Sequence, residues 1–173
     1  SETFPIHYED SPAAHSYIDS RVTRYQEGLD VGYRYYEKNN VPVQYPFGHG
    51  LSYSWFLYQN LSMKQWKDGK VTISYEIENA SDRDGKEVSQ VYVREISPFV
   101  YRPLKELKNF SKDEIKAGEK KKITLELCKR DFAHYSVSED TWIVSKGIYE
   151  ILVGASSADI RLTGKIFLGE PED

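Results

Sequence analysis

The chain has 173 residues, of which 39% are hydrophobic and 14% aromatic, and it carries a formal net charge of −4. This length and composition predict one globular domain with a substantial core, and they exclude a disordered chain. The acidic balance and the absence of an apolar run of about 18 residues argue against nucleic acid and against a membrane as partners.

Cys128 is the one cysteine, so an intrachain disulfide is excluded. This favours a cytoplasmic location over secretion without deciding between them. Because the chain begins at Ser1 and not at Met, we expect a piece of a longer protein.

Residues 1 to about 24 show no hydrophobic period, which predicts extended chain. Ser11 as N-cap and Pro12 at the first helical position also allow a short helix over Ala13–Ile18. Farther along, the sequence allows a short strand over Val31–Tyr36. Prolines and glycines then end any regular element, at Pro42, Pro46, Gly48 and Gly50.

From Ser54 onward the pattern changes to short strands separated by turns. The apolar and aromatic run Trp55–Trp66 ends at Asp68-Gly69, a pair that favours a tight hairpin. In Lys70–Glu78, apolar and polar residues alternate with the period of two that marks a half-buried strand. The apolar face of this strand consists of Val71, Ile73, Tyr75 and Ile77.

More strands follow, with turn residues between them and no long helix. They are predicted over Val88–Arg94, Lys120–Cys128, Trp142–Val144, Ile148–Val153 and about Ile160–Leu168. A total of six to eight short strands indicates an all-β fold, an antiparallel β-sandwich.

The stretch Tyr25–Tyr53 is dense in Tyr, Gly and Pro and has no regular period. So many aromatic residues outside regular structure are typical of a connector packed against something large. Two of its blocks, YQEGLDVGYRYY and PFGHGLSY, resemble the junction in glycoside hydrolase family 3 enzymes of the β-glucosidase type. In that family an α/β sandwich domain is followed there by a fibronectin type III-like domain.

Segments after the connector carry the resemblance almost to the end of the chain, through about Leu168. EVSQVYV and WIVSKGIYEILVGASSAD are similar to strands of the family's domain, and RPLKELKNF is similar to one of its loops. The resemblance implies an immunoglobulin/fibronectin type III-like antiparallel β-sandwich over residues 54–173. Residues 1–53 would be an irregular N-terminal extension, the tail and connector of the α/β sandwich domain.

The resemblance also implies where the chemistry of the family lies. Its members are known as retaining glycosidases, which use one carboxylate as nucleophile and another as acid/base. The family's nucleophilic Asp belongs to a TIM-barrel domain and its acid/base Glu to the α/β sandwich domain or elsewhere, and neither segment matches these residues. We therefore expect a non-catalytic C-terminal-type portion of a β-glucosidase, itself inactive, that buttresses the catalytic domains of a parent hydrolysing O-glycosyl bonds.

No catalytic, cofactor-binding or metal-binding residue is predicted, and no cofactor. Asp131, His134 and Ser136 lie within six residues but lack a nucleophile elbow, so a hydrogen-bonded structural His is the better interpretation. His7 with a neighbouring carboxylate allows a metal, although a chain terminus is the simpler explanation.

Nine connector residues are predicted to contact the catalytic domains. Arg34, between two tyrosines, is suited to stacking or to pairing with a carboxylate. The alternative is that these residues only cover the core of their own domain. The predicted interface consists of Tyr33, Arg34, Tyr35, Phe47, Gly48, His49, Gly50, Leu51 and Tyr53.

Two functions of other classes stay open. A carbohydrate-binding module would stack exposed aromatic rings on a glucan or glucoside, provided that the rings share one face; the candidates are Trp66, Tyr101, Tyr135 and Trp142. An independent enzyme would need a positioned pair of carboxylates, which the sequence does not reveal.

Overall fold

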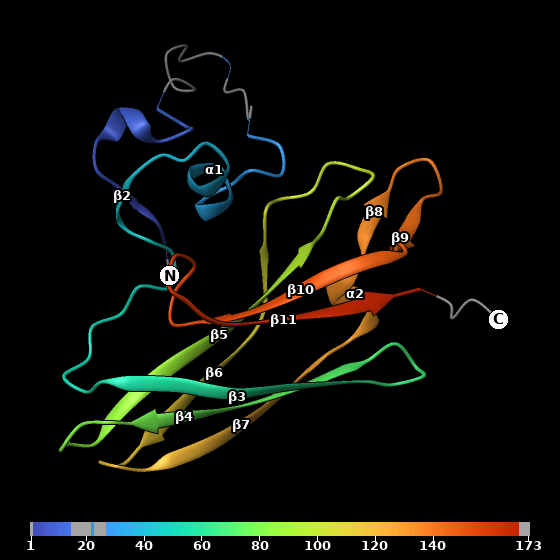
Figure 1. The fold of residues 1–173 in the computed structure, drawn as a ribbon. Helices are drawn as coiled ribbons and strands as arrows, with labels where there is room; N and C mark the ends of the chain where they lie inside the picture. Colours follow the sequence, from blue (N-terminus) through green and yellow to red (C-terminus); the bar gives the residue numbers. More distant parts are fainter. Residues whose placement is uncertain (1, 15–21, 23–26, 170–173) are drawn as a thin grey trace.

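Two antiparallel sheets form a sandwich in the computed structural model, which describes residues 2–14, 22 and 27–169 (Figure 1). The first sheet has the order β11-β10-β5-β6 and comprises β5 (Gly85–Glu95), β6 (Glu106–Ile115), β10 (Gly147–Gly154) and β11 (Ile160–Leu168). The second has the order β3-β4-β7 and comprises β3 (Phe56–Gln65), β4 (Val71–Asn79) and β7 (Lys120–Leu127). The predicted all-β sandwich is confirmed.

Short elements decorate the sandwich. Two small ladders pair β1 (Phe4–Pro5) with β2 (Val43–Tyr45) and β8 (His134–Ser136) with β9 (Thr141–Ile143). The helical segments are η1 (Tyr8–Asp10), α1 (Tyr33–Lys38) and α2 (Lys129–Phe132). Among the described residues, no helix is long and apolar enough to span a membrane.

The strand β4 forms as its alternation predicts. It pairs with β3 on one side and β7 on the other, and its four apolar side chains are buried between the sheets. At the predicted Asp68-Gly69 turn, the Trp66 amide donates to the Lys70 carbonyl over 2.9 Å. Gly69 has a φ of 82°, a left-handed conformation that glycine adopts without steric cost.

The main core lies between the two sheets. Within the described residues it starts at Phe56 and draws on strands of both sheets and on Phe132 of α2. Inside it, Tyr75 places its hydroxyl 2.7 Å from the Ser89 hydroxyl, so this buried polar group is satisfied. Each large apolar side chain buried between the sheets contributes about 1.5–3 kcal/mol to the free energy of unfolding.

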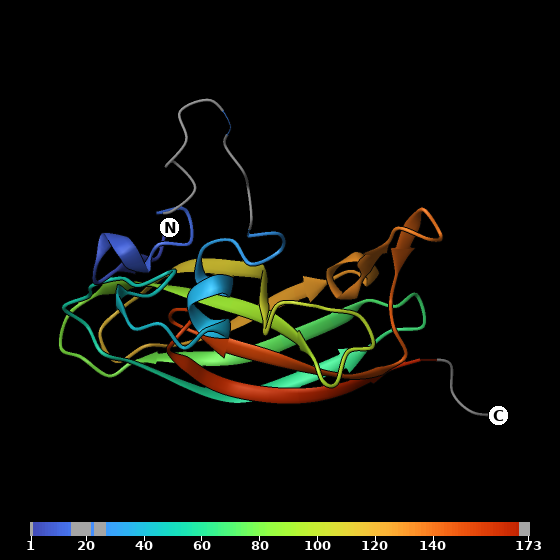
Figure 2. The ribbon, with the colours of Figure 1, turned by 90° about the horizontal axis from the view of Figure 1, so that it is seen from above.

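A second, smaller cluster lies on the outer face of the four-stranded sheet, where α1 lies over the strands (Figure 2). Because strand side chains alternate, Tyr92 of β5 and Leu152 of β10 point away from the main core. Tyr33 of α1 covers them, with its ring 4.8 Å from that of Phe47 and 6.0 Å from that of Tyr92. The extension is thus packed on the sandwich.

The strand predicted over Val31–Tyr36 is wrong, because the segment forms α1. Gly32, with a φ of 63°, turns the chain into the helix, and its carbonyl accepts a hydrogen bond from the Tyr35 amide. Tyr33 and Tyr36 are three residues apart and both buried, which a helix achieves on one face and a strand cannot. The helix allowed over Ala13–Ile18 lies largely outside the described residues.

The interpretation of Arg102–Phe110 as a loop is also wrong in part, because β6 begins at Glu106. The less exposed side of this strand carries Asn109, Ser111 and Asp113, with an apolar residue only at Ile115. Since these inward positions are polar, the hydrophobic alternation that marks a strand is missing.

Because the main core begins at Phe56, we expect a chain that starts at Ser54 to fold. Removing residues 1–53 would uncover Tyr92 and Leu152 and lower the free energy of unfolding by about 2–4 kcal/mol. Near-ultraviolet circular dichroism and urea denaturation of the truncated and complete chains measure both effects. A truncated chain without a cooperative transition would show that the extension belongs to the folding unit.

Candidate interdomain surface

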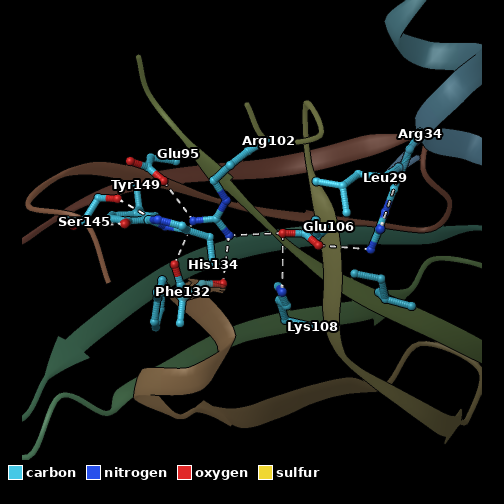
Figure 3. A network of polar contacts seen from close by, with 12 residues as sticks. Leu29, Arg34, Glu95, Arg102, Glu106, Lys108, Phe132, His134, Ser145 and Tyr149 are labelled. Carbon is cyan, nitrogen blue, oxygen red and sulfur yellow. Dashed lines mark hydrogen bonds and ion pairs between the residues drawn. The ribbon is translucent and has the colours of Figure 1, made fainter. Parts of the chain in front are cut away.

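A buried cluster of charges joins the ends of β5 and β6 (Figure 3). Arg102 lies in the connection between these strands, residues 96–105, here called the β5–β6 loop, and its side chain is only 6% exposed. Its guanidinium donates to Glu95 over 2.8 Å, to Glu106 over 3.1 Å and to the carbonyls of Phe132 and Ala133. One side chain thus connects two strands and α2.

Glu106 extends this cluster to the N-terminal extension. It pairs with Arg34 of α1 over 3.0 Å and with Lys108 over 3.5 Å (Figure 3). Burial alone would raise the pKa of Glu106, but Lys108, Arg102 and Arg34 outweigh it and hold the pKa below its usual value. For Arg102, burial opposes the charge, and the two carboxylates more than compensate, so its pKa is raised.

Further contacts attach the extension to the β5–β6 loop. The buried carboxylate of Asp30 accepts hydrogen bonds from Tyr101 of the loop and, over 2.5 Å, from Lys38 of α1. Lys105 of the loop pairs with Glu37 of α1 over 2.6 Å. The segment 29–38 and the β5–β6 loop are therefore held together by ion pairs and hydrogen bonds.

Part of the predicted interface faces the protein's own sandwich. Tyr33 and Phe47 cover the outer cluster, Arg34 pairs with Glu106, and Tyr35 packs its ring against that of Tyr36, 5.4 Å away. Tyr33, Phe47 and Arg34 thus contact the four-stranded sheet or the cluster on its outer face, whereas the ring contact of Tyr35 stays within α1.

The rest of the predicted interface follows β2 in the chain and leads outward. The His49 ring lies 5.1 Å from that of Tyr45, and Gly50 borders open space. Leu51 and Tyr53 are 93% and 94% exposed, so they contact almost nothing in this chain. Assignment of the nine residues to an interface with catalytic domains stays a prediction.

Gly48 occupies a place that no other residue fits. Its φ is 79°, and a Cβ would lie 2.1 Å from Oε1 of Gln90. Gln90 is fixed, since its amide donates to the carbonyls of Gly48 and Ala155 and its Oε1 accepts from Tyr92 over 2.6 Å. This contact fixes the backbone at Gly48, three residues before Leu51.

Sequence reasoning missed the most exposed large apolar side chain of the β5–β6 loop, Phe99, which is 99% exposed. The loop also exposes Val100 and Leu104. The signal that was available is an apolar run around Pro98, outside any predicted strand. The ion-pair cluster was missed because its members are as many as 72 residues apart in the chain.

Of the aromatic residues considered for carbohydrate binding, Trp66 lies between β3 and β4, Tyr101 lies in the β5–β6 loop, and the other two lie on β8 and β9. Cations face three of the four rings. The guanidinium of Arg130 lies 3.1 Å from the centre of the Trp142 ring, and Lys64 lies 3.8 Å from that of Trp66. Lys38 lies 4.3 Å from the centre of the Tyr101 ring, and Tyr135 packs edgewise on Trp142. Since a sugar stacks on a free ring face, this geometry does not favour such a platform.

The residues considered for other chemistry serve local structure. Asp131 accepts a hydrogen bond from the Cys128 amide over 2.7 Å and so caps α2, while His134 lies 3.5 Å from the Ser145 hydroxyl. Near the N-terminus, the carboxylate of Asp10 accepts from the backbone amide of His7. In the described part of the chain, no three His, Cys, Asp or Glu residues are grouped to hold a metal.

Comparison with known proteins identifies the class of protein to which the chain belongs. Residues 87–157 match the fibronectin type III-like domain family, in agreement with the sandwich. The chain is 41% identical to thermostable β-glucosidase B of Acetivibrio thermocellus, over 94% of this chain and 22% of that protein. It is 42% identical to a putative β-glucosidase of Schizosaccharomyces pombe, over 96% of this chain and 20% of that protein.

Solved structures give the same result. A glycoside hydrolase family 3 β-glucosidase of Bifidobacterium adolescentis superposes with a TM-score of 0.91 and 36% identity, covering 99% of this chain and 26% of the other. β-Glucosidase 3B of Thermotoga neapolitana gives 0.90 and 38%, covering 98% and 24%. The chain is thus a fibronectin type III-like portion of a protein of glycoside hydrolase family 3. It spans about a fifth of the length of the curated relatives it matches.

Replacing Arg102 with Met would leave Glu95 and Glu106 as buried charges without their central partner. We expect the free energy of unfolding to fall by about 3–5 kcal/mol. The control is Arg83→Met, because Arg83 forms an exposed ion pair with Asp82 and its loss should change stability by less than about 1 kcal/mol. Guanidinium denaturation measures both, and equal effects would contradict the role of the cluster.

Replacing Gly48 with Ala would force a positive φ on a residue with a Cβ and push Gln90 from its hydrogen bonds. We expect a loss of about 2–4 kcal/mol from these two terms. Gly50→Ala, two residues on, meets open space and should stay within about 0.5 kcal/mol. Thermal unfolding of both variants provides the comparison, and a Gly48→Ala protein as stable as the parent would show that the contact is not restrictive.

Proposed function

We propose that this chain buttresses the catalytic domains of a β-glucosidase-type glycoside hydrolase and is itself non-catalytic. The parent would hydrolyse O-glycosyl bonds, and its catalytic domains would be the partner of this chain. The sequence relatives support this assignment, since those compared above carry the name β-glucosidase. A relative in Bifidobacterium breve, 37% identical, is named an exo-α-(1→6)-L-arabinopyranosidase, so the names of the relatives differ in the sugar.

The attachment of the extension to the sandwich carries this proposal. Asp30, Arg34 and Glu37 of the extension are bound to Tyr101, Glu106 and Lys105 respectively. A connector that is held at three points cannot act as a flexible linker. A body joined to the sandwich through such a connector would keep a fixed orientation, which is what a buttress requires.

The test separates the parent polypeptide into this chain and the remainder that holds the catalytic domains. Hydrolysis of an aryl β-glucoside is measured for the remainder alone, for this chain alone and for both together. We expect activity of the remainder to rise at least tenfold when the chain is added, because the catalytic domains are then held in place, and we expect no turnover by the chain alone.

Other results would change the assignment. A remainder that is fully active and indifferent to the chain would contradict a buttressing role. Turnover by the chain alone would contradict the non-catalytic assignment. The Arg83→Met chain, altered at an exposed ion pair, serves as a control that should restore activity as well as the unaltered chain does.

A further inference from the structure

The β5–β6 loop presents an apolar surface that this chain does not cover. Phe99 is almost fully exposed, and Val100 and Leu104 are partly so. Two residues before the phenyl ring, Ser97 has a φ of 55°, in the left-handed region that costs energy for a residue with a Cβ. A strained backbone that exposes an aromatic ring to water suggests that the ring contacts a partner outside this chain.

The loop is anchored on both sides of Phe99 by contacts within the chain. At its start the Ile96 amide donates to the carbonyl of Ile148 over 2.8 Å. After Phe99, the Tyr101 hydroxyl donates a hydrogen bond to Asp30. The next residue, Arg102, is held by Glu95 and Glu106. A loop held in one conformation loses little entropy when a partner binds, which favours affinity.

The neighbourhood of the loop indicates which partner covers it. The loop is bound to segment 29–38, the connector that precedes the sandwich in the chain, and both lie on the same side of the molecule (Figure 1). A body attached through this connector would therefore lie beside the loop. The relatives are large enough to supply it, because the chain spans only 20–22% of the length of the relatives described above.

We propose that the β5–β6 loop is a docking surface for the catalytic portion of the same parent polypeptide. Phe99 is its central apolar contact and Arg102 is the residue that positions the loop. This inference rests on the proposed buttressing function and adds to it a specific contact point outside the nine connector residues. Aromatic residues on rigid elements are common hot spots of protein interfaces, which suits Phe99 to this role.

The experiment measures the dissociation constant between this chain and the remainder of the parent polypeptide by isothermal titration calorimetry. Phe99→Ser should weaken binding at least tenfold and leave the melting temperature of the chain unchanged, since the ring contacts nothing within it. Phe167→Ser is the matched control, an exposed phenylalanine of β11 away from the loop and the connector, and it should stay within twofold of the unaltered chain.

The positioning role of Arg102 has its own test. Arg102→Lys keeps the charge but loses the two-pronged contact with Glu95 and Glu106, which should loosen the loop. We expect this variant to weaken binding in the presence of Phe99 and to have no further effect in the Phe99→Ser chain. Purely structural damage would instead weaken binding by the same factor in both backgrounds.

Each other outcome has a separate meaning. If the unaltered chain does not bind the remainder, the proposed function and this inference both fail. If it binds and Phe99→Ser binds equally well, or if Phe167→Ser is just as harmful, the loop proposal is overturned while the buttressing function stands. If sedimentation shows that the chain alone dimerises and that Phe99→Ser abolishes the dimer, the surface binds a second copy and the proposal is likewise overturned.

Discussion

The buried guanidinium of Arg102 is the constraint on which the arrangement of the extension depends. A charge removed from water must be paired, and Arg102 is paired by two carboxylates and two backbone carbonyls. These partners come from the end of β5, the start of β6 and the α2 region. Because Glu106 also binds Arg34, the same cluster decides where α1 lies.

The ion pairs and the apolar core have different roles in this protein. Burial of side chains between the sheets supplies the bulk of the stability, and that core needs no residue of the extension among those described. A buried ion pair adds little net stability, because desolvation offsets most of the attraction between its charges. The pairs around Arg102 and Asp30 instead fix the β5–β6 loop and α1 relative to each other. Ion pairs do this because they are more directional than apolar contacts.

The sequence predicts the part of the fold in which each residue's environment follows from its neighbours in the chain. In β4 the inward residues from Val71 to Ile77 are all apolar, so the alternation identifies both the strand and its buried face. In β6 the inward residues are mostly polar, and in α1 the choice of helix depends on Tyr92 and Leu152, which lie far along the chain. The contacts that join the extension to the β5–β6 loop and to β6 link residues separated by 68 to 74 positions, and no local pattern indicates them.

The predicted interface separates into residues that face the sandwich and residues that face outward. Tyr33 and Phe47 are engaged with the outer face of the four-stranded sheet, so they have little surface left for another body. Leu51, Tyr53 and Phe99 contact almost nothing here, and burying them on a partner would remove three large apolar side chains from water. The inward set orients the connector and the outward set remains available for a partner. An interface of this kind needs both, because exposed apolar residues give specific binding only where the backbone beneath them is held in place.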